Sequence, residues 1–288
     1  MANPYEADPD KIPITDLYVD VPFYGRYYPK PDDFCVDLRH VNSQTTDSLR
    51  YWASVVSLCT EEIRIYPADE GGRDVFALGS VIVKSSHLHP HTHQGAPYME
   101  IDFTYADENE LRAIVLAKAV LKNVKVPEIY FAGKVNSRQV LIQERLPGVA
   151  LCVAWPYLTS DQTKSFKEQA RGILRQLHAT KPTKTLQARS HVVPDPNILN
   201  NGRINPLEAK ILFATTNDDT DMSFMHNDFT QPNCIVDIDT IVGLIDWEMA
   251  GFFGWNTAGE VHRQIRTPQR EHFVNANLEE EQLRDMIF

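Results

Sequence analysis

"HNDFTQPN", residues 226–233, decides how the rest of the chain is interpreted. It places Asp228 two positions after His226, and Asn233 five positions after Asp228. An ordinary surface loop has no need of this trio. A site that orients a hydroxyl group and holds a metal ion does, because it needs a carboxylate beside the hydroxyl and oxygen ligands for the cation. We therefore take these eight residues as the candidate centre of a reactive site.

Two apolar stretches follow, "CIVDID" (234–239) and "IVGLIDWE" (241–248). They predict two short strands joined by an acidic turn. Asp246 interrupts the second stretch between Ile245 and Trp247, a context typical of buried sequence, and a buried carboxylate needs a partner. Asn233 and Asp246 both offer oxygen ligands, which Mg²⁺ prefers.

Further upstream, Lys84 ends the apolar stretch "VIVK" (81–84), and Glu108 and Glu110 lie near the start of a predicted helix. Glu110 is the better candidate partner for the lysine, because Ala113 and Ile114 continue the buried face of the helix from it. A strand lysine held by a helix glutamate suits the phosphates of a nucleotide. Together with the first two motifs, this is the layout that protein kinases use for phosphoryl transfer.

Periodicity and turn residues predict the other elements. Residues 1–42 form an extended arm, followed by a helix over 43–60 and an antiparallel meander over 62–66, 74–78 and 80–86. A helix over 107–122, with Asp107 as its N-cap, precedes strands over 128–135 and 138–146. A helix over 160–180 starts with a Thr159–Gln162 capping box, and a short helix begins at 206. The mixture of strands and helices indicates an α+β protein.

The composition is that of a globular protein, with 43% hydrophobic and 23% charged residues. A net charge of −11 argues against a nucleic-acid partner, because such binding relies on neutralising phosphates. No apolar run approaches the length of a membrane helix, and the start lacks the features of a signal peptide. We therefore expect a cytoplasmic protein with no membrane partner, whose four separated cysteines stay reduced.

The chain resembles the aminoglycoside phosphotransferase/choline kinase family, especially its fungal members. Their usual motifs are H-G-D-x-x-x-x-N and I-D-W-E, which "HNDFTQPN" and "IDWE" match here. The stretches "VFALGSVIVK" (75–84) and "KVPEIY" (125–130) also look like the family's N-lobe. The resemblance implies a protein-kinase-like, two-lobed α+β fold, with a small antiparallel-sheet N-lobe and a mainly helical C-lobe that is unusually short in this chain.

The resemblance also implies an activity. It is that of an ATP-dependent phosphotransferase, which moves the γ-phosphate of Mg-ATP to a hydroxyl group of a small molecule. ATP and a small-molecule hydroxyl acceptor would be the partners, and Mg²⁺ the cofactor. The implied organisation is an N-terminal arm (1–42), a nucleotide-binding N-lobe (43–145) and a C-lobe with the catalytic loop and metal site (146–288).

Residue roles carry over by position. Asp228 would be the base that orients the acceptor hydroxyl, and Asn233 and Asp246 would bind Mg²⁺. Lys84 would contact the nucleotide phosphates, with Glu110 as its helix partner. The backbone from 143 to 146 would be the hinge that reads adenine, which makes the remaining cofactor-binding residues Glu144, Arg145 and Leu146, and His226 would support the catalytic loop.

Two features depart from the family pattern. Asn227 replaces the usual glycine, a mild change because asparagine tolerates unusual backbone angles. The segment after the "IDWE" motif is shorter than in relatives. The wall of the acceptor site would therefore be short, or would come from the N-terminal arm or from a second chain. The last of these is compatible with a homodimer. Glu248, Trp255 and Glu260 lie where the pocket mouth is expected, although the aromatic cluster also fits core packing.

Three other interpretations stay open. A kinase-like fold that has lost its chemistry, a pseudokinase, would act as a non-catalytic binding module. The alternating His87, His89, His91 and His93 would instead indicate a metal-dependent hydrolase, although Pro90 and Pro97 favour a plain loop. A protein kinase is disfavoured, because no "APE" motif follows "IDWE" and "WEMAGFFGW" (247–255) runs directly into helix-like sequence.

Overall fold

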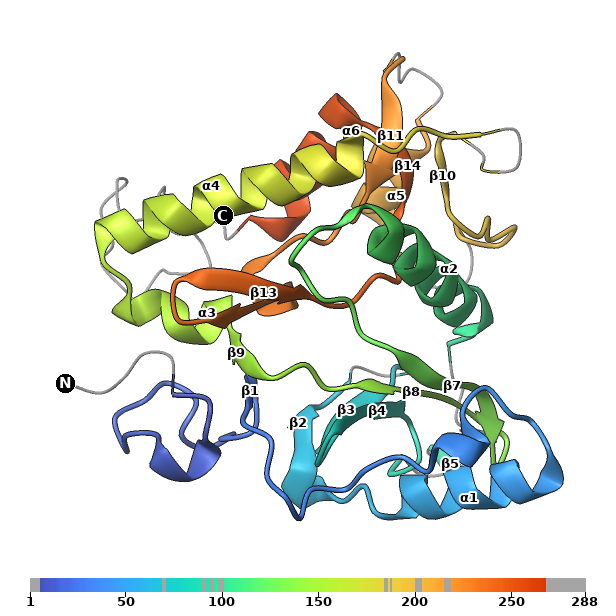
Figure 1. Ribbon diagram of the computed structural model, residues 1–288. Coiled ribbons are helices and arrows are strands. Elements are labelled where there is room, and N and C mark those ends of the chain that lie inside the picture. Colours follow the sequence, from blue (N-terminus) through green and yellow to red (C-terminus); the bar gives the residue numbers. More distant parts are fainter. Residues whose placement is uncertain are drawn as a thin grey trace.

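The computed structural model describes residues 6–68, 71–89, 92–93, 96–97, 101–183, 186, 188–199, 204–214 and 219–267. Within these ranges, no helix is both long enough and apolar enough to cross a membrane. The four cysteines are free thiols. The chain forms two lobes, with the strands of the N-lobe at the bottom of Figure 1 and the C-lobe above them.

The N-lobe is built on a five-stranded antiparallel sheet in the order β2-β3-β4-β8-β7. Its strands are β2 (Arg64–Tyr66), β3 (Asp74–Leu78), β4 (Val81–Ser85), β7 (Ile129–Val135) and β8 (Arg138–Glu144). The predicted meander is confirmed. Asn136 and Ser137 both have positive φ angles, as a tight two-residue hairpin turn between β7 and β8 requires.

Two helices cover opposite faces of this sheet (Figure 1). On the outer face lies α1 (Thr46–Ser57), which buries Trp52, Val55 and Val56 and is capped by the Thr45 side chain. On the inner face lies α2 (Thr104–Val120). Asp107 is not its N-cap, a prediction that was wrong: the helix begins earlier, and Asp107 is a buried residue of its first turns.

The C-lobe begins with a sheet that includes the N-terminal arm. Its order is β1-β9-β12-β13, with β1 (Arg26–Tyr27), β9 (Gly148–Ala150), β12 (Cys234–Asp237) and β13 (Thr240–Leu244). Next to it lie α3 (Leu151–Ala154) and the long α4 (Ser160–His178). The predicted capping box at Thr159 and Gln162 is present, and the apolar stripe of α4 is buried as expected.

A second small sheet completes the C-lobe, in the order β10-β14-β11. It contains β10 (Ser190–His191), β11 (Met222–Met225) and β14 (Gly251–Gly254), and α5 (Pro206–Leu212), α6 (Trp255–Val261) and a π-helical turn (His262–Arg266) pack beside it. The expectation that "WEMAGFFGW" (247–255) runs directly into a helix is confirmed, because α6 begins at Trp255; the strand β14 within this stretch was not predicted. A separate pair, β5 (Thr92–His93) and β6 (Ala96–Pro97), lies in the chain between β4 and α2.

The main hydrophobic core crosses the junction between the lobes. It joins Ala113 and Ile114 of α2 and Leu141 of β8 to Phe166 of α4 and Trp247, next to Asp246. A second core lies between α1 and the outer face of the N-lobe sheet. Because the first core is shared, the two lobes hold the groups between them in a fixed relation. The two-lobed α+β fold expected from the sequence is confirmed.

Candidate active site

A cavity of about 490 Å³ lies between the lobes. Lys84 and Val75 line it from the N-lobe sheet, and Asn233 and Asp246 line it from the C-lobe. Apolar side chains form much of the rest of its wall, among them Ile82, Leu146, Ile235 and Ile245. A concave, mainly apolar site with a few convergent polar groups is the usual form of a small-molecule site.

Lys84 is the central cation of this cavity. Its strand alternates buried and half-buried positions, which places Lys84 on the same face as Ile82 and opposite Val83. Its Nζ lies 2.8 Å from Asp246 Oδ1 and 3.4 Å from Glu110 Oε2. The predicted partnership with Glu110 therefore holds in the geometry, whereas Glu108 pairs with Arg112 at the surface.

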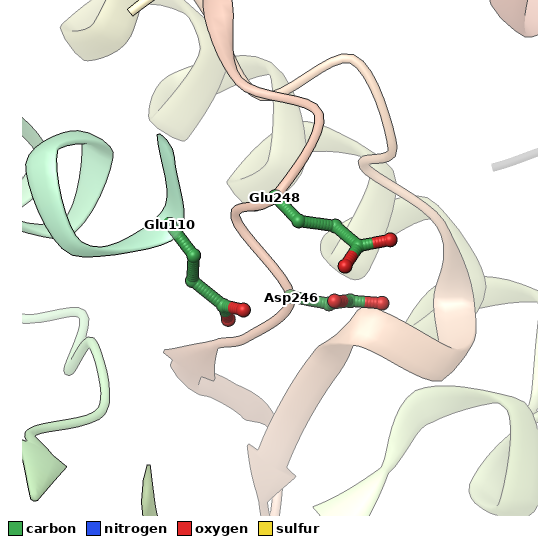
Figure 2. A group of neighbouring side chains, drawn as sticks. All are labelled: Glu110, Asp246 and Glu248. Carbon is green, nitrogen blue, oxygen red and sulfur yellow. The ribbon is translucent and has the colours of Figure 1, made fainter. Parts of the chain in front are cut away.

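Glu110, Asp246 and Glu248 form an acidic group (Figure 2), and the first two of them pair with Lys84. One ligand atom from each lies within 4.8 Å of the others. Burial raises the pKa of Glu110, and the neighbouring carboxylates raise it further, against the attraction of Lys84. Burial alone would also raise the pKa of Asp246, but the charge of Lys84 holds it below its usual value. Asp246 is thus the carboxylate that stays ionised beside the lysine.

The His226 imidazole connects the loop of residues 226–233 to the segment before Asp246. Its Nε2 donates to the Ile245 carbonyl at 3.0 Å, and its Nδ1 accepts from the Asp228 amide at 3.2 Å. Complete burial lowers the pKa of His226 to about 4, so the ring is neutral at physiological pH. Asn227 adopts a φ of +62°, in the left-handed region, and its side chain donates to the Met249 carbonyl. Asparagine tolerates this region better than most residues, which explains why it can stand at this position.

Asp228 and Asn233 meet, as their spacing predicts. The Asn233 Nδ2 donates to the Asp228 carbonyl at 2.8 Å and to Asp228 Oδ2 at 3.0 Å. Since the amide nitrogen is committed to Asp228, the Oδ1 of Asn233 is the atom of this side chain that could face a cation. Burial raises the pKa of Asp228 to about 6, against the opposing charge of Arg266.

Arg266 and Glu208 are site residues that the sequence analysis missed. The Arg266 Nε lies 2.9 Å from Asp228 Oδ1, and its Nη2 donates to both carboxylate oxygens of Glu208 at 2.8 Å. Glu208 is only 2% exposed, so the arginine is held by a buried charge on α5. The two residues are 58 positions apart in the sequence, and no local pattern links them.

At the hinge, where the backbone was expected to read the base, two of the amides are already hydrogen-bonded to carbonyls of the protein. The Glu144 amide donates to the Glu128 carbonyl at 2.8 Å, and the Arg145 amide donates to the Ser80 carbonyl at 2.9 Å. Among the described residues, the Leu146 amide has no such partner, although all three hinge residues line the cavity. The Arg145 side chain turns away toward the N-terminal arm.

Arg73 was also missed. It lines the cavity, forms two hydrogen bonds of 2.8 and 2.9 Å with Asp107 of α2, and stacks on the Phe103 ring with 4.0 Å between the guanidinium carbon and the ring centroid. The pair fixes the start of α2, the helix that carries Glu110. A basic residue on the segment before β3 gave no sequence signal, because its partner is distant in the chain.

The sequence of residues 79–252 matches the phosphotransferase enzyme family. This match covers well over half of the chain and contains Lys84, Glu110, Asp228, Asn233 and Asp246. The chain belongs to the phosphotransferase enzyme family. A comparison with curated proteins finds no match.

Solved structures of phosphotransferases are also similar to this chain. The streptomycin–ATP ternary complex of APH(2")-IIa is 12% identical, with 80% of this chain and 85% of that chain covered and a TM-score of 0.44. ADP-bound aminoglycoside phosphotransferase APH(2'')-Ib is 13% identical, with coverages of 84% and 96% and a TM-score of 0.44. Macrolide 2'-phosphotransferase MphH from Brachybacterium faecium is 13% identical, with coverages of 74% and 82% and a TM-score of 0.39. Family membership rests on the sequence match and not on these structures.

The remaining expectations fall outside the cavity. The His87 Nε2 donates to the Cys59 carbonyl at 2.8 Å, and His89 lies 3.3 Å from Asp74, while the other two histidines of that loop have side chains outside the described residues. Trp255 packs edge-on against His178, and Glu260 of α6 pairs with Arg263 of the π-helical turn. Of the three residues expected at the pocket mouth, only Glu248 lines the cavity.

Proposed function

We propose that this member of the phosphotransferase enzyme family moves the γ-phosphate of Mg-ATP to a hydroxyl group of a small molecule. The observation that carries the proposal is the convergence of Lys84, Asn233 and Asp246 at one cavity, with Asp228 hydrogen-bonded to Asn233 beside it. Transfer needs a cation for the phosphates, oxygen ligands for a metal and a base for the acceptor. The family match supports phosphotransferase chemistry, and these side chains supply each of its parts.

The proposed step moves one proton and one phosphoryl group. Asp228 accepts the proton of the acceptor hydroxyl, and the hydroxyl oxygen forms a bond to the γ-phosphorus. The bond between that phosphorus and the bridging oxygen to the β-phosphate breaks, and ADP leaves with its electron pair. Lys84 neutralises phosphate charge, and Glu110 holds it in place. Most of the catalysis would come from this positioning and electrostatic stabilisation.

The donor set fits Mg²⁺. Asp246 is a carboxylate whose pKa is held low by Lys84, and Asn233 has its amide nitrogen turned to Asp228. Both are hard oxygen ligands of the type that Mg²⁺ takes, and Glu248 adds a further carboxylate within the acidic cluster. Bound there with ATP, the ion would neutralise charge that develops on the phosphates.

We also propose the functional division that the resemblance implied. Residues 43–145 would bind the nucleotide, together with the amide of Leu146, the residue directly after them, as the donor that reads the base. Residues 146–288 would carry the catalytic loop and the metal site. The N-terminal arm (1–42) would support both, because its strand β1 joins the C-lobe sheet.

One observation favours a second candidate, a kinase-like binding module without catalysis. The Arg266 ion pair occupies Asp228, the residue that would accept the acceptor's proton. If this pair were permanent, nucleotide binding would persist without transfer. The two candidates therefore differ in turnover and agree in nucleotide affinity.

The first test is calorimetric titration with ATP and with GTP, each with and without Mg²⁺. We expect Mg²⁺-dependent binding that Asp246→Ala removes, because that substitution deletes a metal ligand. Binding that is unchanged in the variant would show that the metal assignment is wrong.

The second test separates the two candidates. Asp228→Asn should retain nucleotide binding but lower phosphoryl transfer by roughly 10²- to 10⁴-fold, the usual contribution of a general base. Asp237→Asn, an exposed aspartate of the neighbouring β12, is the matched control and should transfer at the wild-type rate. Turnover that is near normal in Asp228→Asn would remove this carboxylate from the mechanism.

A further inference from the structure

Residues 16–27 form a segment that we call the N-terminal strap. It ends in β1, which pairs antiparallel with β9 directly after the hinge, and the Ala150 amide donates to the Gly25 carbonyl at 2.7 Å. Figure 1 shows β1 beside β9 at the junction of the two lobes. The family match begins at residue 79, so the strap lies outside the part of the chain that defines the family.

The backbone of the strap fits closely against the C-lobe at Gly25. This glycine has a φ of +61°, and a Cβ atom there would lie 2.8 Å from both the Ala150 Cβ and the Val153 Cγ2. Such distances are shorter than van der Waals contact, and side chains rarely adopt this φ. Glycine is therefore required for the strap to dock.

Arg145 of the hinge ties the strap to the N-lobe. Its guanidinium donates to the carbonyls of Phe23 at 3.0 Å and Arg26 at 2.7 Å in the strap, and to the Gly79 carbonyl at 3.3 Å in the N-lobe. It also lies over the Tyr27 ring, 4.6 Å from its centroid. Only 8% of Arg145 is exposed, so these contacts replace water for a buried cation.

A second anchor lies at the start of the strap. Arg26 and Asp16 form an ion pair of 2.7 Å, with both side chains 3% exposed. The Tyr157 hydroxyl donates to the same carboxylate at 2.9 Å, from the segment before α4. The strap is thus a built part of the molecule, because breaking one partner of a buried pair is costly.

The strap forms one wall of the cavity between the lobes. Phe23, Tyr24 and Tyr27 line it together with Lys84 and Leu146. The strap borders the hinge and β9, so it belongs to the hinge end of the cavity, whereas Lys84 and the acidic group mark the phosphate end. With the strap docked, the cavity retains about 490 Å³, within the usual range for small-molecule sites. The strap therefore encloses space and does not fill it.

We propose that the N-terminal strap completes the base and ribose subsite for a purine nucleoside triphosphate, with Phe23 as the side chain that contacts the bound nucleoside. The inference rests on the proposed function, because it assigns the hinge end of the cavity to the base. The apolar residues Ile82 and Ile235 supply the other walls. Since strap and nucleotide contact each other, each stabilises the bound state of the other.

The experiment measures the Mg-ATP dissociation constant of the full chain by calorimetry. Gly25→Ala should raise this constant roughly tenfold or more, because the added methyl group displaces the strap from Ala150 and Val153. Gly172→Ala is the matched control: a Cβ atom added to this α4 glycine would have nothing within 4 Å, so the variant should bind as the wild type does. Hydrogen exchange of the strap amides should slow when Mg-ATP binds to the wild type.

Phe23→Ala decides the matter if Gly25→Ala does not fold, since it shortens one half-buried side chain and leaves the strap backbone in place. We expect a roughly three- to tenfold weaker Mg-ATP complex, of the order of one truncated apolar contact. The inference is overturned, and the proposed function stands, if two results are found together. Phe23→Ala binds Mg-ATP as tightly as the wild type does, and hydrogen exchange of the strap amides in the wild type does not change when Mg-ATP binds. If the wild type binds neither ATP nor GTP, the proposed function fails and the inference fails with it.

Discussion

At the scale of single residues, the backbone around Asp246 is held from both sides. Asp246 has a φ of +65°, an unusual conformation for a residue with a side chain. The preceding carbonyl, of Ile245, accepts from His226, and the following amide, of Trp247, donates to Glu110 Oε1 at 3.3 Å. Such strain persists where the surroundings over-determine it. The orientation of the Asp246 carboxylate is thus set by two buried side chains that do not themselves need to touch a substrate.

Asp228 gives a prediction of pH dependence. As the proposed base, Asp228 would act when ionised. Its pKa is raised to about 6, so we expect phosphoryl transfer to be lost as the pH falls through about 6. The Arg266 charge lowers this pKa. Arg266→Met should therefore shift the acidic limb of the rate profile to higher pH and reduce transfer at pH 7. The measurement is the pH profile of phosphoryl transfer, with water as the acceptor until another is known.

Arg266→Lys is the control for that prediction, because it keeps a positive charge near Asp228. Its acidic limb should stay close to that of the wild type. An acidic limb that does not move in Arg266→Met would mean that Arg266 only anchors Glu208 and leaves the titration of Asp228 unaffected.

The residues that the sequence could indicate are those whose spacing is local. His226, Asp228 and Asn233 lie in one short loop, and Lys84 ends a recognisable strand. The contacts of Arg73 with Asp107 and of Arg266 with Glu208 join positions 34 and 58 residues apart. No periodicity connects such pairs, since they are created only when the lobes and α5 pack. Neither of these two ion pairs lies in a family motif, so sequence reasoning missed them, whereas it did indicate the pair of Lys84 and Glu110.

At the scale of elements, α2 links the two lobes through its side-chain contacts. Its buried Asn109 donates to the carbonyls of Glu248 at 2.8 Å and Ala250 at 2.9 Å, and accepts from the Val193 amide at 2.8 Å. One side chain thus fixes the segment after Asp246 to the helix that carries Glu110. The helix also packs on β7 and α4, so it transmits the geometry of one lobe to the other.

Asn109→Ala should destabilise the protein. It removes three hydrogen bonds and leaves buried carbonyl and amide groups without partners, which costs roughly 2–4 kcal/mol in the free energy of unfolding. Urea denaturation checks this value. Arg112→Ala on the exposed side of the same helix is the control, and its surface pair with Glu108 should contribute less than about 1 kcal/mol. Equal stability of Asn109→Ala and wild type would show that water replaces the lost contacts.

The elements predicted correctly are those with a strong local signal. α4 has a regular apolar stripe and a capping box, and the β7–β8 hairpin has a two-residue turn. The wrong N-cap at Asp107 and the strand β14, which was not predicted, have a common cause, because both depend on partners that are distant in the chain. Asp107 is an acceptable N-cap by type, but a buried arginine uses its carboxylate. The stretch "GFFG" has no strand length of its own and becomes β14 only by pairing with β10 and β11.

At the scale of the whole molecule, the cavity is assembled from distant parts of one chain. The strap, the N-lobe sheet, the hinge and the segment after β13 all line it, and the main core passes from α2 to α4 behind it. Sequence motifs could therefore indicate the phosphate end, where the family residues lie. The sequence offered the N-terminal arm as a possible wall of the acceptor site, but it could not place the strap beside the hinge, because that position depends on β1 joining the C-lobe sheet.

This arrangement predicts that nucleotide binding stabilises the whole chain. A ligand at roughly 100 times its dissociation constant adds about 2.7 kcal/mol to the free energy of unfolding when it binds only the folded state. For a protein of this size, we expect saturating Mg-ATP to raise the midpoint of thermal unfolding by roughly 4–8 °C. Because the ligand contacts both lobes, the transition should move as one and not split into two steps. The midpoint of Asp246→Ala should not rise when Mg-ATP is added. If the midpoint of the wild type also stays unchanged with Mg-ATP bound, the lobe that unfolds first does not contact the nucleotide.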